Sequence, residues 1–271
     1  MRRHAHRAIA LAATLLLGGA LSGCAAAPAA SAPPAFRVVD GRFVVTLAKG
    51  VERRSEQLIG ATFDIDDGAG GTQQIRIDSV AAAKDRPSVL LHQVSVRNAA
   101  GGWSQMCDAD AQGRRAVIPV RGRWQDDRFV ADPNAWFLTC SSGSRGKCIL
   151  WGYDPWAKAP GGTPLADHYR ACQQMVRADY AGNGAPHTRE GTEIDVADRI
   201  GVTHHDTLED RAFTFEAGWA VDGAVCVART RWPDLATRDQ LVRDHPRLGG
   251  RCDPDSAAAR HALLFTRVRI R

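Results

Sequence analysis

Polar and apolar residues alternate along much of the chain between residues 36 and 135. In the run 72–80, polar residues at 74, 76 and 78 alternate with isoleucines at 75 and 77, which is the period of a strand with one face in water. Asp40-Gly41 is a typical hairpin turn between two such runs. The pattern therefore predicts a β-rich region over 36–135, with a hairpin at 36–47 and strands at 58–65, 72–80, 88–96, 103–107, 115–124 and 128–139.

A helical spacing of three to four residues follows residue 163. Apolar residues recur at this spacing, at Leu165, Tyr169, Cys172, Val176 and Tyr180. Thr163-Pro164 is a typical helix start, while Gly182 and Gly184 predict where the helix ends. The other runs of this half predict a short helix at 236–244 and strands at 149–153, 192–196, 212–219, 224–230 and 263–270.

These elements indicate an α+β fold that is mostly β. Short strands at fairly regular spacing predict an antiparallel sandwich or a partly open barrel. One central amphipathic helix and one or two short helices complete the fold. The regions 36–135 and 136–271 either form separate domains or pack as one unit.

The N-terminus has the pattern of a bacterial lipoprotein signal. Three arginines precede the apolar run 8–20, which is too short to span a bilayer. Leu21-Ser22-Gly23-Cys24 then resembles a lipobox, in which the cysteine is acylated and becomes the first mature residue. We expect a signal peptide at 1–23, lipidation (palmitate among the acyl chains) at Cys24, and a disordered Ala/Pro tether over 24–35.

This signal predicts a cell-envelope protein of a Gram-negative type of bacterium, bound to the membrane through its N-terminal lipid. Ala25 follows the cysteine in place of the aspartate that resembles an inner-membrane retention signal, so the outer membrane is favoured and its face is left open. Cleavage removes three arginines from a chain of formal net charge +5. The basic balance is thus partly a targeting feature, and no nucleic-acid partner is expected.

Six cysteines remain besides Cys24, and an even number in an exported chain indicates disulfides. Zinc is disfavoured because no C-x-x-C pair occurs. Six cysteines allow fifteen pairings. The pairings we predict are Cys140–Cys148 across a short loop, Cys226–Cys252 across a helix-containing loop, and, by elimination, Cys107–Cys172.

Asp179 and His187 are the candidate catalytic residues. An anion near a helix C-terminus is disfavoured by the helix dipole, so Asp179 needs a partner, for which Arg177, His187 and Thr188 are candidates. The pair either braces the turn or acts as an acid and base. Bracing is favoured because neither a nucleophile nor a set of metal ligands accompanies it. His204-His205-Asp206 is the most metal-like cluster, although an exposed loop is the commoner meaning, and no metal or cofactor is expected.

The region around Asp179 resembles the ADYC-domain family, named for an Ala-Asp-Tyr-Cys tetrapeptide. Two flanking blocks, 147–156 and 215–232, also resemble family motifs. Ala181 stands where the family has its cysteine, which implies a lost or re-paired disulfide. The resemblance implies an exported bacterial protein and points to no particular reaction. The motif residues are Arg177, Ala178, Asp179, Tyr180, Gly182, Gly184, His187, Thr188, Gly191 and Thr192.

Three hypotheses about function follow. The first is a lipid-anchored, non-catalytic envelope module that binds a protein or a glycan. The second is a periplasmic hydrolase that uses Asp179 and His187, with Arg177 or Thr188 stabilising charge. The third is a zinc-binding envelope protein that uses His204 and His205. An open cleft around Asp179 and His187 favours the second, and a buried, satisfied network favours the first.

Overall fold

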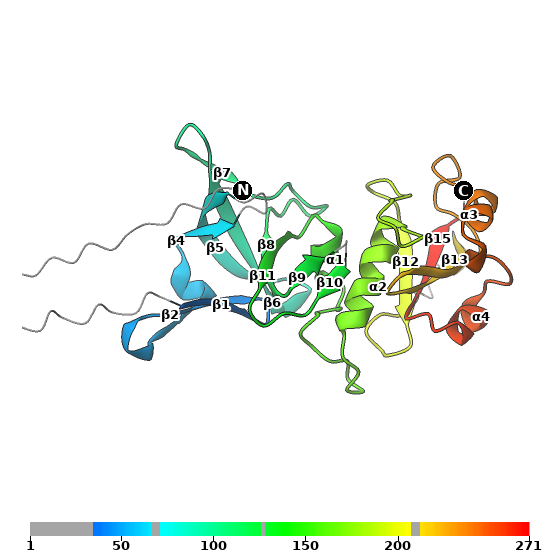
Figure 1. The fold of residues 1–271 in the computed structure, drawn as a ribbon, viewed down its shortest axis with the longest axis horizontal. Coiled ribbons are helices and arrows are strands. Elements are labelled where there is room, and N and C mark those ends of the chain that lie inside the picture. The colour runs from blue at the N-terminus through cyan, green and yellow to red at the C-terminus, as the bar shows by residue number, and fades with distance from the viewer. Residues whose placement is uncertain (1–34, 67–70, 126–127, 207–211, 271) are drawn as a thin grey trace, which may run out of the picture. The chain divides into compact units, whose positions relative to one another are not determined.

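The computed structural model describes residues 35–66, 71–125, 128–206 and 212–270 (Figure 1). The predicted signal peptide, the predicted lipidation site Cys24 and all of the predicted tether before Ala35 lie outside these residues. Within the described part of the chain, none of the helices combines the length and the hydropathy needed to cross a membrane.

Antiparallel strands form the first half. The turn Asp40-Gly41 has positive φ at both residues (48° and 73°), which is the geometry of a two-residue hairpin whose twist matches its strands. A three-stranded sheet has the order β1-β2-β3, and a larger sheet has the order β11-β8-β6-β5-β4, with β7 on β6. The strands are β1 (Ala35–Val39), β2 (Arg42–Thr46), β3 (Glu52–Arg54), β4 (Thr62–Asp66), β5 (Thr72–Ala83), β6 (Arg86–Arg97), β7 (Trp103–Gln105), β8 (Val117–Arg121), β9 (Arg123–Gln125), β10 (Arg128–Val130) and β11 (Trp136–Cys140). The β9–β10 pair forms a separate ribbon.

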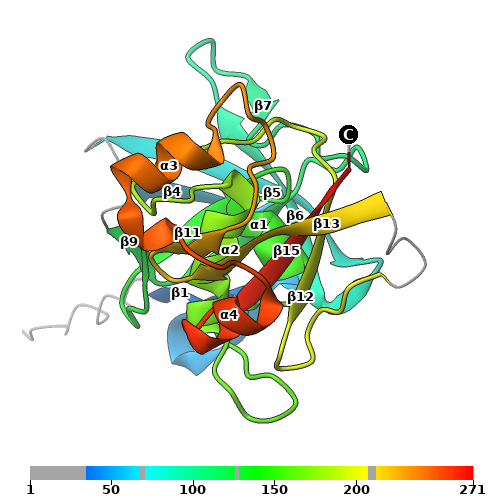
Figure 2. The ribbon, with the colours of Figure 1, turned by 90° about the vertical axis from the view of Figure 1, so that its right-hand side faces the viewer.

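The second half packs helices on a four-stranded antiparallel sheet of order β12-β15-β13-β14 (Figure 2). Its strands are β12 (Ile194–Asp198), β13 (Phe213–Ala220), β14 (Gly223–Val227) and β15 (Leu264–Arg269). The α-helices are α1 (Ser144–Leu150), α2 (Ala166–Arg177), α3 (Arg238–Asp244) and α4 (Pro254–Ala259). Short 3₁₀ turns lie at Ala48–Gly50, Ser55–Leu58 and Pro246–Leu248.

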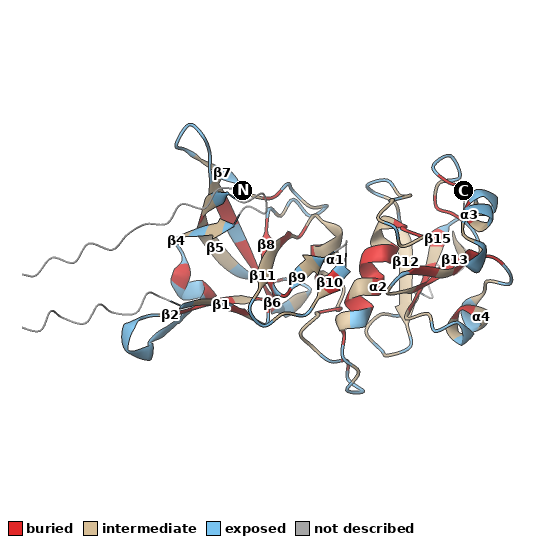
Figure 3. Ribbon diagram, viewed as in Figure 1, coloured by how far each residue is buried: buried red, intermediate tan, exposed pale blue. Residues whose placement is uncertain are grey.

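Helices cover both faces of this second sheet. Ala217 and Trp219 of β13 belong to the same apolar core as Tyr169 and Met175 of α2. The residue between them, Gly218, faces α4, where an added Cβ would approach Ala257. The alternation of β13 therefore separates two packing surfaces, and much of α2 is buried (Figure 3).

These observations confirm an α+β fold dominated by antiparallel strands, with α2 as its central helix. Several details of the prediction are wrong. The central helix begins at Ala166, after the predicted start at Thr163-Pro164, and the predicted strand 128–139 is divided between β10 and β11.

Residues 149–153, predicted as a strand, begin inside α1, because a short apolar run does not distinguish a strand from a buried helical turn. The central helix ends at Arg177, before Tyr180, because Ala178 adopts the left-handed conformation (φ 49°, ψ 42°) there.

Three disulfides brace the fold, and their pairing corrects two predictions. The bonds join Cys107–Cys140, Cys148–Cys172 and Cys226–Cys252, with Cα–Cα distances of 5.6, 5.8 and 5.6 Å. Cys140–Cys148 and Cys107–Cys172 are therefore wrong, and Cys226–Cys252 is confirmed. Cys107 and Cys140 both face the apolar cluster of the first sheets, whereas Cys148 lies in α1, which packs against α2.

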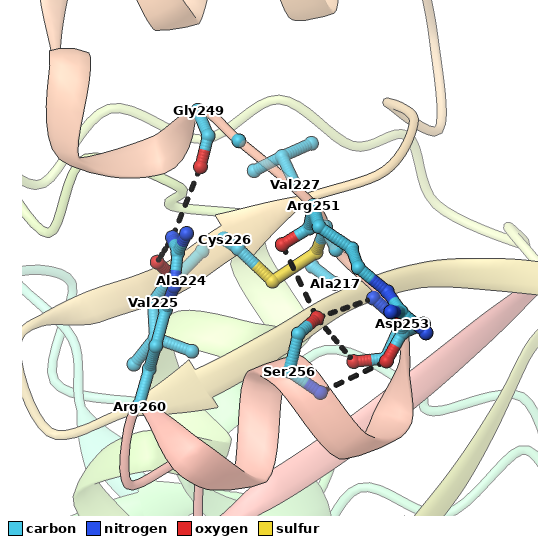
Figure 4. The surroundings of a disulfide bond; sticks show 12 residues. Ala217, Ala224, Val225, Cys226, Val227, Gly249, Arg251, Asp253, Ser256 and Arg260 are labelled. Atoms are coloured by element: carbon cyan, nitrogen blue, oxygen red, sulfur yellow. Dashed lines mark hydrogen bonds and ion pairs between the residues drawn. A yellow bond between two sulfur atoms is a disulfide. The ribbon is translucent and has the colours of Figure 1, made fainter.

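The Cys226–Cys252 bond ties β14 to the segment that leads into α4 (Figure 4). Asp253 caps α4 by accepting a hydrogen bond from the Ser256 N–H at 2.8 Å. Arg260, just after α4, donates to the carbonyl oxygens of Val225 and Gly249 at 3.2 and 3.0 Å. The disulfide and these hydrogen bonds together hold α4 and its flanking segments against the sheet.

Candidate functional site

The Arg177–Tyr180 motif begins where α2 ends. The N–H groups of Ala178 and Asp179 return to the carbonyl oxygens of Met175 and Gln174 at 3.0 and 2.9 Å. This is the Schellman ending of a helix, in which glycine is the usual left-handed residue. Here Ala178 takes that place, fully buried, so the chain turns sharply and directs Asp179 and Tyr180 into the protein.

Asp179 is bound by backbone amides. Its carboxylate oxygens accept hydrogen bonds from the N–H groups of Asn183 and Gly184 at 3.1 and 2.7 Å, and the residue is only 1% exposed. The partners predicted for Asp179, namely Arg177, His187 and Thr188, are therefore wrong as hydrogen-bond partners. Two amide dipoles compensate the buried charge.

His187 and Arg177 hold the same turn from its other side. The Nδ1 atom of His187 lies 3.1 Å from the carbonyl oxygen of Ala178, and its ring lies 5.8 Å from the ring of Tyr180 between centroids. Arg177 donates to the carbonyl oxygen of Gly184. Asp179 and His187 thus contact backbone groups of one loop and brace it, and within the described part of the chain no hydrogen bond joins their two side chains.

Tyr180 belongs to a buried network with two charged residues. Its hydroxyl donates to the Glu216 carboxylate at 2.8 Å and accepts from the Arg231 N–H at 3.0 Å. The Arg231 guanidinium donates to the same carboxylate at 2.8 Å, and the two side chains are 1% and 0% exposed. Burial, reinforced by the charge of Glu216, raises the pKa of Tyr180 well above its usual value. The hydroxyl therefore remains a donor.

Arg231 also caps the C-terminal end of α2. Its guanidinium donates to the carbonyl oxygens of Met175 and Val176 at 2.6 and 3.2 Å, which lie in the last turn of the helix. A cation at that position satisfies unpaired carbonyls and interacts favourably with the helix dipole. One arginine thus connects α2, Tyr180 and β13, which carries Glu216.

The loop after Tyr180 lies directly on the β13–β14 hairpin. The N–H of Ala224 donates to the Tyr180 carbonyl oxygen at 2.9 Å, and an added Cβ at Gly182 (φ 69°) would overlap the Asp222 carbonyl. Arg247 donates to the carbonyl oxygens of Ala181 and Ala224 at 2.7 and 2.6 Å. Only glycine permits this close approach at 182.

The end of the motif forms a hydrogen-bonded turn. Gly191 takes a positive φ of 76°, and the Thr192 hydroxyl donates to the Arg189 carbonyl at 2.7 Å. The same hydroxyl accepts from the Trp232 indole N–H at 2.9 Å, while Thr188 is half-buried. Although Ala181 replaces the family's cysteine, no cysteine in the described part of the chain is left unpaired. The three disulfides use all six cysteines there.

The His204-His205-Asp206 cluster is engaged by neighbouring charges. The Nδ1 atom of His205 lies 3.1 Å from the Asp195 carboxylate, which also accepts from the Arg267 guanidinium at 2.7 Å. His204 is exposed. Among residues 35–66, 71–125, 128–206 and 212–270, no three His, Cys, Asp or Glu side chains form a group that could hold a metal ion.

Two cavities adjoin α2. One, of about 680 Å³, lies where the helix begins and is lined by Arg128, Asp167 and Arg170 among others. The other, of about 300 Å³, is lined by residues of α1 and α2 and by Trp124. Arg145 and Gln173 of this cavity were not singled out from the sequence. Glu216 and Arg231 of the buried network lie in the block 215–232 that resembles a family motif, but no role was predicted for them. Two features of the sequence could have indicated buried polar groups. These are the charge of Glu216 within an apolar strand and the paired glutamines 173–174 in an apolar helix face.

The fold and the motif define a disulfide-braced, mostly antiparallel β protein in which an Ala-Asp-Tyr turn joins a central helix to a sheet. A family model described as the ADYC domain matches residues 55–233, about two thirds of the chain. The chain therefore belongs to the ADYC-domain family. Searches of curated proteins and of solved structures found no match.

Proposed function

We propose that this protein is a non-catalytic binding module of the bacterial cell envelope, held at the outer membrane by lipid on Cys24. The single observation that carries the non-catalytic part is the position of Asp179, whose carboxylate is buried and bound by two backbone N–H groups. A general acid or base must reach the proton that it transfers. The carboxylate of Asp179 instead accepts hydrogen bonds from the backbone of its own loop.

The envelope part rests on the lipobox-like tetrapeptide Leu21–Cys24 and on the disulfides. Three disulfides are typical of a protein that folds outside the reducing cytosol. Lipid anchoring through more than one acyl chain gives stable membrane attachment. A module of this kind presents its folded part to a protein or a glycan of the envelope.

Membrane fractionation of a Cys24→Ala variant tests the anchoring. The full-length chain should sediment with membranes and, after purification in detergent, show the mass of an acylated Cys24 at its N-terminus. The Cys24→Ala variant should lose both properties, and Ser22→Ala, which leaves the thiol in place, serves as the matched control. An unmodified Cys24 in the membrane-free fraction of the wild type would overturn the proposal.

Turnover assays test the absence of catalysis. The purified chain, offered fluorogenic esters, peptides and glycosides, should release product no faster than buffer. Hydrolysis that disappears in both Asp179→Asn and His187→Gln, with folding intact by circular dichroism, would instead support the hydrolase.

A further inference from the structure

The hairpin that joins β2 to β3 ends in a closed turn, residues 47–51, which we call the hairpin tip. Its backbone is fixed by two hydrogen bonds, from the Leu47 N–H to the Val51 carbonyl oxygen at 2.7 Å and from the Gly50 N–H to the Leu47 carbonyl oxygen at 3.2 Å. Every residue from 47 to 54 is exposed (the loop after β2 in Figure 3). The hairpin tip therefore presents a defined shape to its surroundings.

The hairpin tip exposes two large apolar side chains. Leu47 is 39% and Val51 46% exposed, although aliphatic side chains of this size are usually buried. A single exposed aliphatic residue is ordinary, whereas here one lies at each end of the same closed turn. Adjacent apolar groups rimmed by polar ones are typical of a surface that binds a partner or a membrane.

Basic residues outnumber acidic ones around the hairpin tip. Residues 47–54 include three basic side chains and one acid, Glu52. The Arg37 guanidinium lies 2.5 Å from the Glu52 carboxylate, so this ion pair already compensates the acid. Among the described residues, neither Lys49 nor Arg53 has an ion-pair partner. Apolar side chains beside such cations match an anionic phospholipid surface, which offers both hydrocarbon and phosphate.

The predicted tether joins the sheet beside the hairpin tip. Ala35, the first residue of β1, pairs with Thr46, and Thr46 pairs in turn with Glu52 of β3. The start of β1 and the hairpin tip therefore lie at the same end of this sheet. Ten residues separate Cys24 from Ala35, and such a segment spans at most about 40 Å. A lipid on Cys24 thus holds this end of the sheet within that distance of the bilayer.

We infer that the hairpin tip docks on the membrane to which the lipid anchors the protein. Leu47 and Val51 enter the boundary between head groups and acyl chains, and Lys49 and Arg53 attract the phosphates of anionic phospholipids. Two aliphatic side chains alone bind a bilayer weakly. The anchor makes the contact intramolecular and so raises the effective concentration of the bilayer. The inference rests on the proposed lipid anchor and adds an orientation to it, with the β1–β3 sheet toward the bilayer.

Photocrosslinking to lipid tests the contact. The acylated protein, with benzoylphenylalanine in place of Val51, is reconstituted in vesicles of phosphatidylethanolamine and phosphatidylglycerol, and illumination should attach phospholipid to that position. The matched control carries the same photoreactive residue in place of Leu235, which is 43% exposed and lies between β14 and α3. The control should attach at most about a tenth as much phospholipid, because it gains nothing from docking. Equal attachment at the two positions, attachment to a second copy of the chain, or no attachment at Val51 would each overturn the inference.

Lys49→Gln tests the electrostatic part of the contact. With benzoylphenylalanine kept at Val51, the ratio of docked to undocked protein should fall about fivefold, the usual contribution of one basic residue near an anionic surface. Lys84→Gln, at the exposed turn between β5 and β6, is the matched control and should leave attachment unchanged. That turn lies near the opposite end of β2, where Arg42 donates to the Ser88 carbonyl oxygen at 3.4 Å.

Two changes of conditions should reproduce the effect of Lys49→Gln. Replacing phosphatidylglycerol by phosphatidylcholine removes the negative surface charge, and added salt screens it. Thermal unfolding checks that both lysine variants fold. Attachment that responds neither to Lys49→Gln nor to the charge of the lipid would overturn the assignment to anionic phospholipid.

Failure of this inference and failure of the proposed function are distinguishable. An acylated Cys24 with no phospholipid attached at Val51 removes only the docking of the hairpin tip. An unmodified Cys24 in the membrane-free fraction of the wild type removes the anchor itself.

Discussion

Two regions of the protein differ in the kinds of groups that they bury. Beneath the first sheets, Phe36 lies 5.0 Å from Phe63 and 5.0 Å from Trp136 between ring centroids, within a cluster of aliphatic side chains. Around the end of α2, by contrast, the buried groups include the ionised pair Glu216 and Arg231. The first core depends on apolar area and shape, and the second also depends on an ion pair and on the hydrogen bonds of Tyr180 and Arg231.

This difference determines how each half responds to substitution. An apolar core loses stability roughly in proportion to the atoms removed. A buried charge network loses far more when one member is changed, because the remaining partner is left uncompensated. The ADYC motif lies in the second kind of core, where Tyr180 and its partners hold the end of α2 on the sheet.

The largest expected effect is at Glu216. Glu216→Gln removes the negative charge between Tyr180 and Arg231 and should lower the free energy of unfolding by about 3–5 kcal/mol, the usual loss for a broken buried pair. Ile77→Val in the apolar core of the first half should lower it by only about 0.5–1.5 kcal/mol. Urea unfolding measures both. Equal losses would remove the distinction between the two cores.

The second effect is at Gly182. Gly182→Ala places a Cβ against the Asp222 carbonyl in a left-handed backbone, so we expect a loss of about 3–4 kcal/mol from overlap and strain together. Gly191 has a similar φ of 76° with no atom within 4 Å of an added Cβ, and Gly191→Ala should cost only about 1–2 kcal/mol. Thermal unfolding compares them. A Gly182→Ala protein as stable as Gly191→Ala would contradict the close contact with the hairpin.

The third effect is a pH dependence in the first half. Burial lowers the pKa of His92 from 6.5 to about 4, and its Nε2 atom lies 2.8 Å from the Ser55 hydroxyl. Between pH 6.5 and about 4, His92 is therefore protonated in the unfolded chain and neutral in the folded chain. The free energy of unfolding consequently falls as the pH drops through this range. The loss should total about 3 kcal/mol.

Urea unfolding at several pH values measures this dependence. His92→Gln should flatten the curve between the two pKa values, and a substitution of the exposed His204 should leave it unchanged. A wild-type curve that is already flat in this window would show that His92 is protonated in the folded protein.

Local chemistry made part of this fold predictable. The Asp40-Gly41 hairpin and the alternating strand β5 follow from neighbouring residues alone, and the final strand, β15, was placed within a residue of its observed ends. Cys226–Cys252 was predictable because both residues flank one compact loop. The ending of α2 was missed because it depends on a left-handed alanine, where glycine is expected.

Contacts between distant segments made the rest unpredictable. The Cys107–Cys140 bond depends on how the first sheets bring the turn after β7 to the end of β11, and no spacing rule encodes that distance. The partners of Asp179 are backbone amides, which carry no residue-specific signal in the sequence. Tyr180, Glu216 and Arg231 lie far apart in the sequence and meet because α2 packs on β13.

The most direct test of the structural role of the motif is the unfolding free energy of Asp179→Ala. If the carboxylate holds the loop through the Asn183 and Gly184 amides, its removal should lower that free energy by about 3 kcal/mol, the sum of two hydrogen bonds to a charged acceptor. A loss below about 0.5 kcal/mol would contradict the account and return Asp179 to consideration as a functional group.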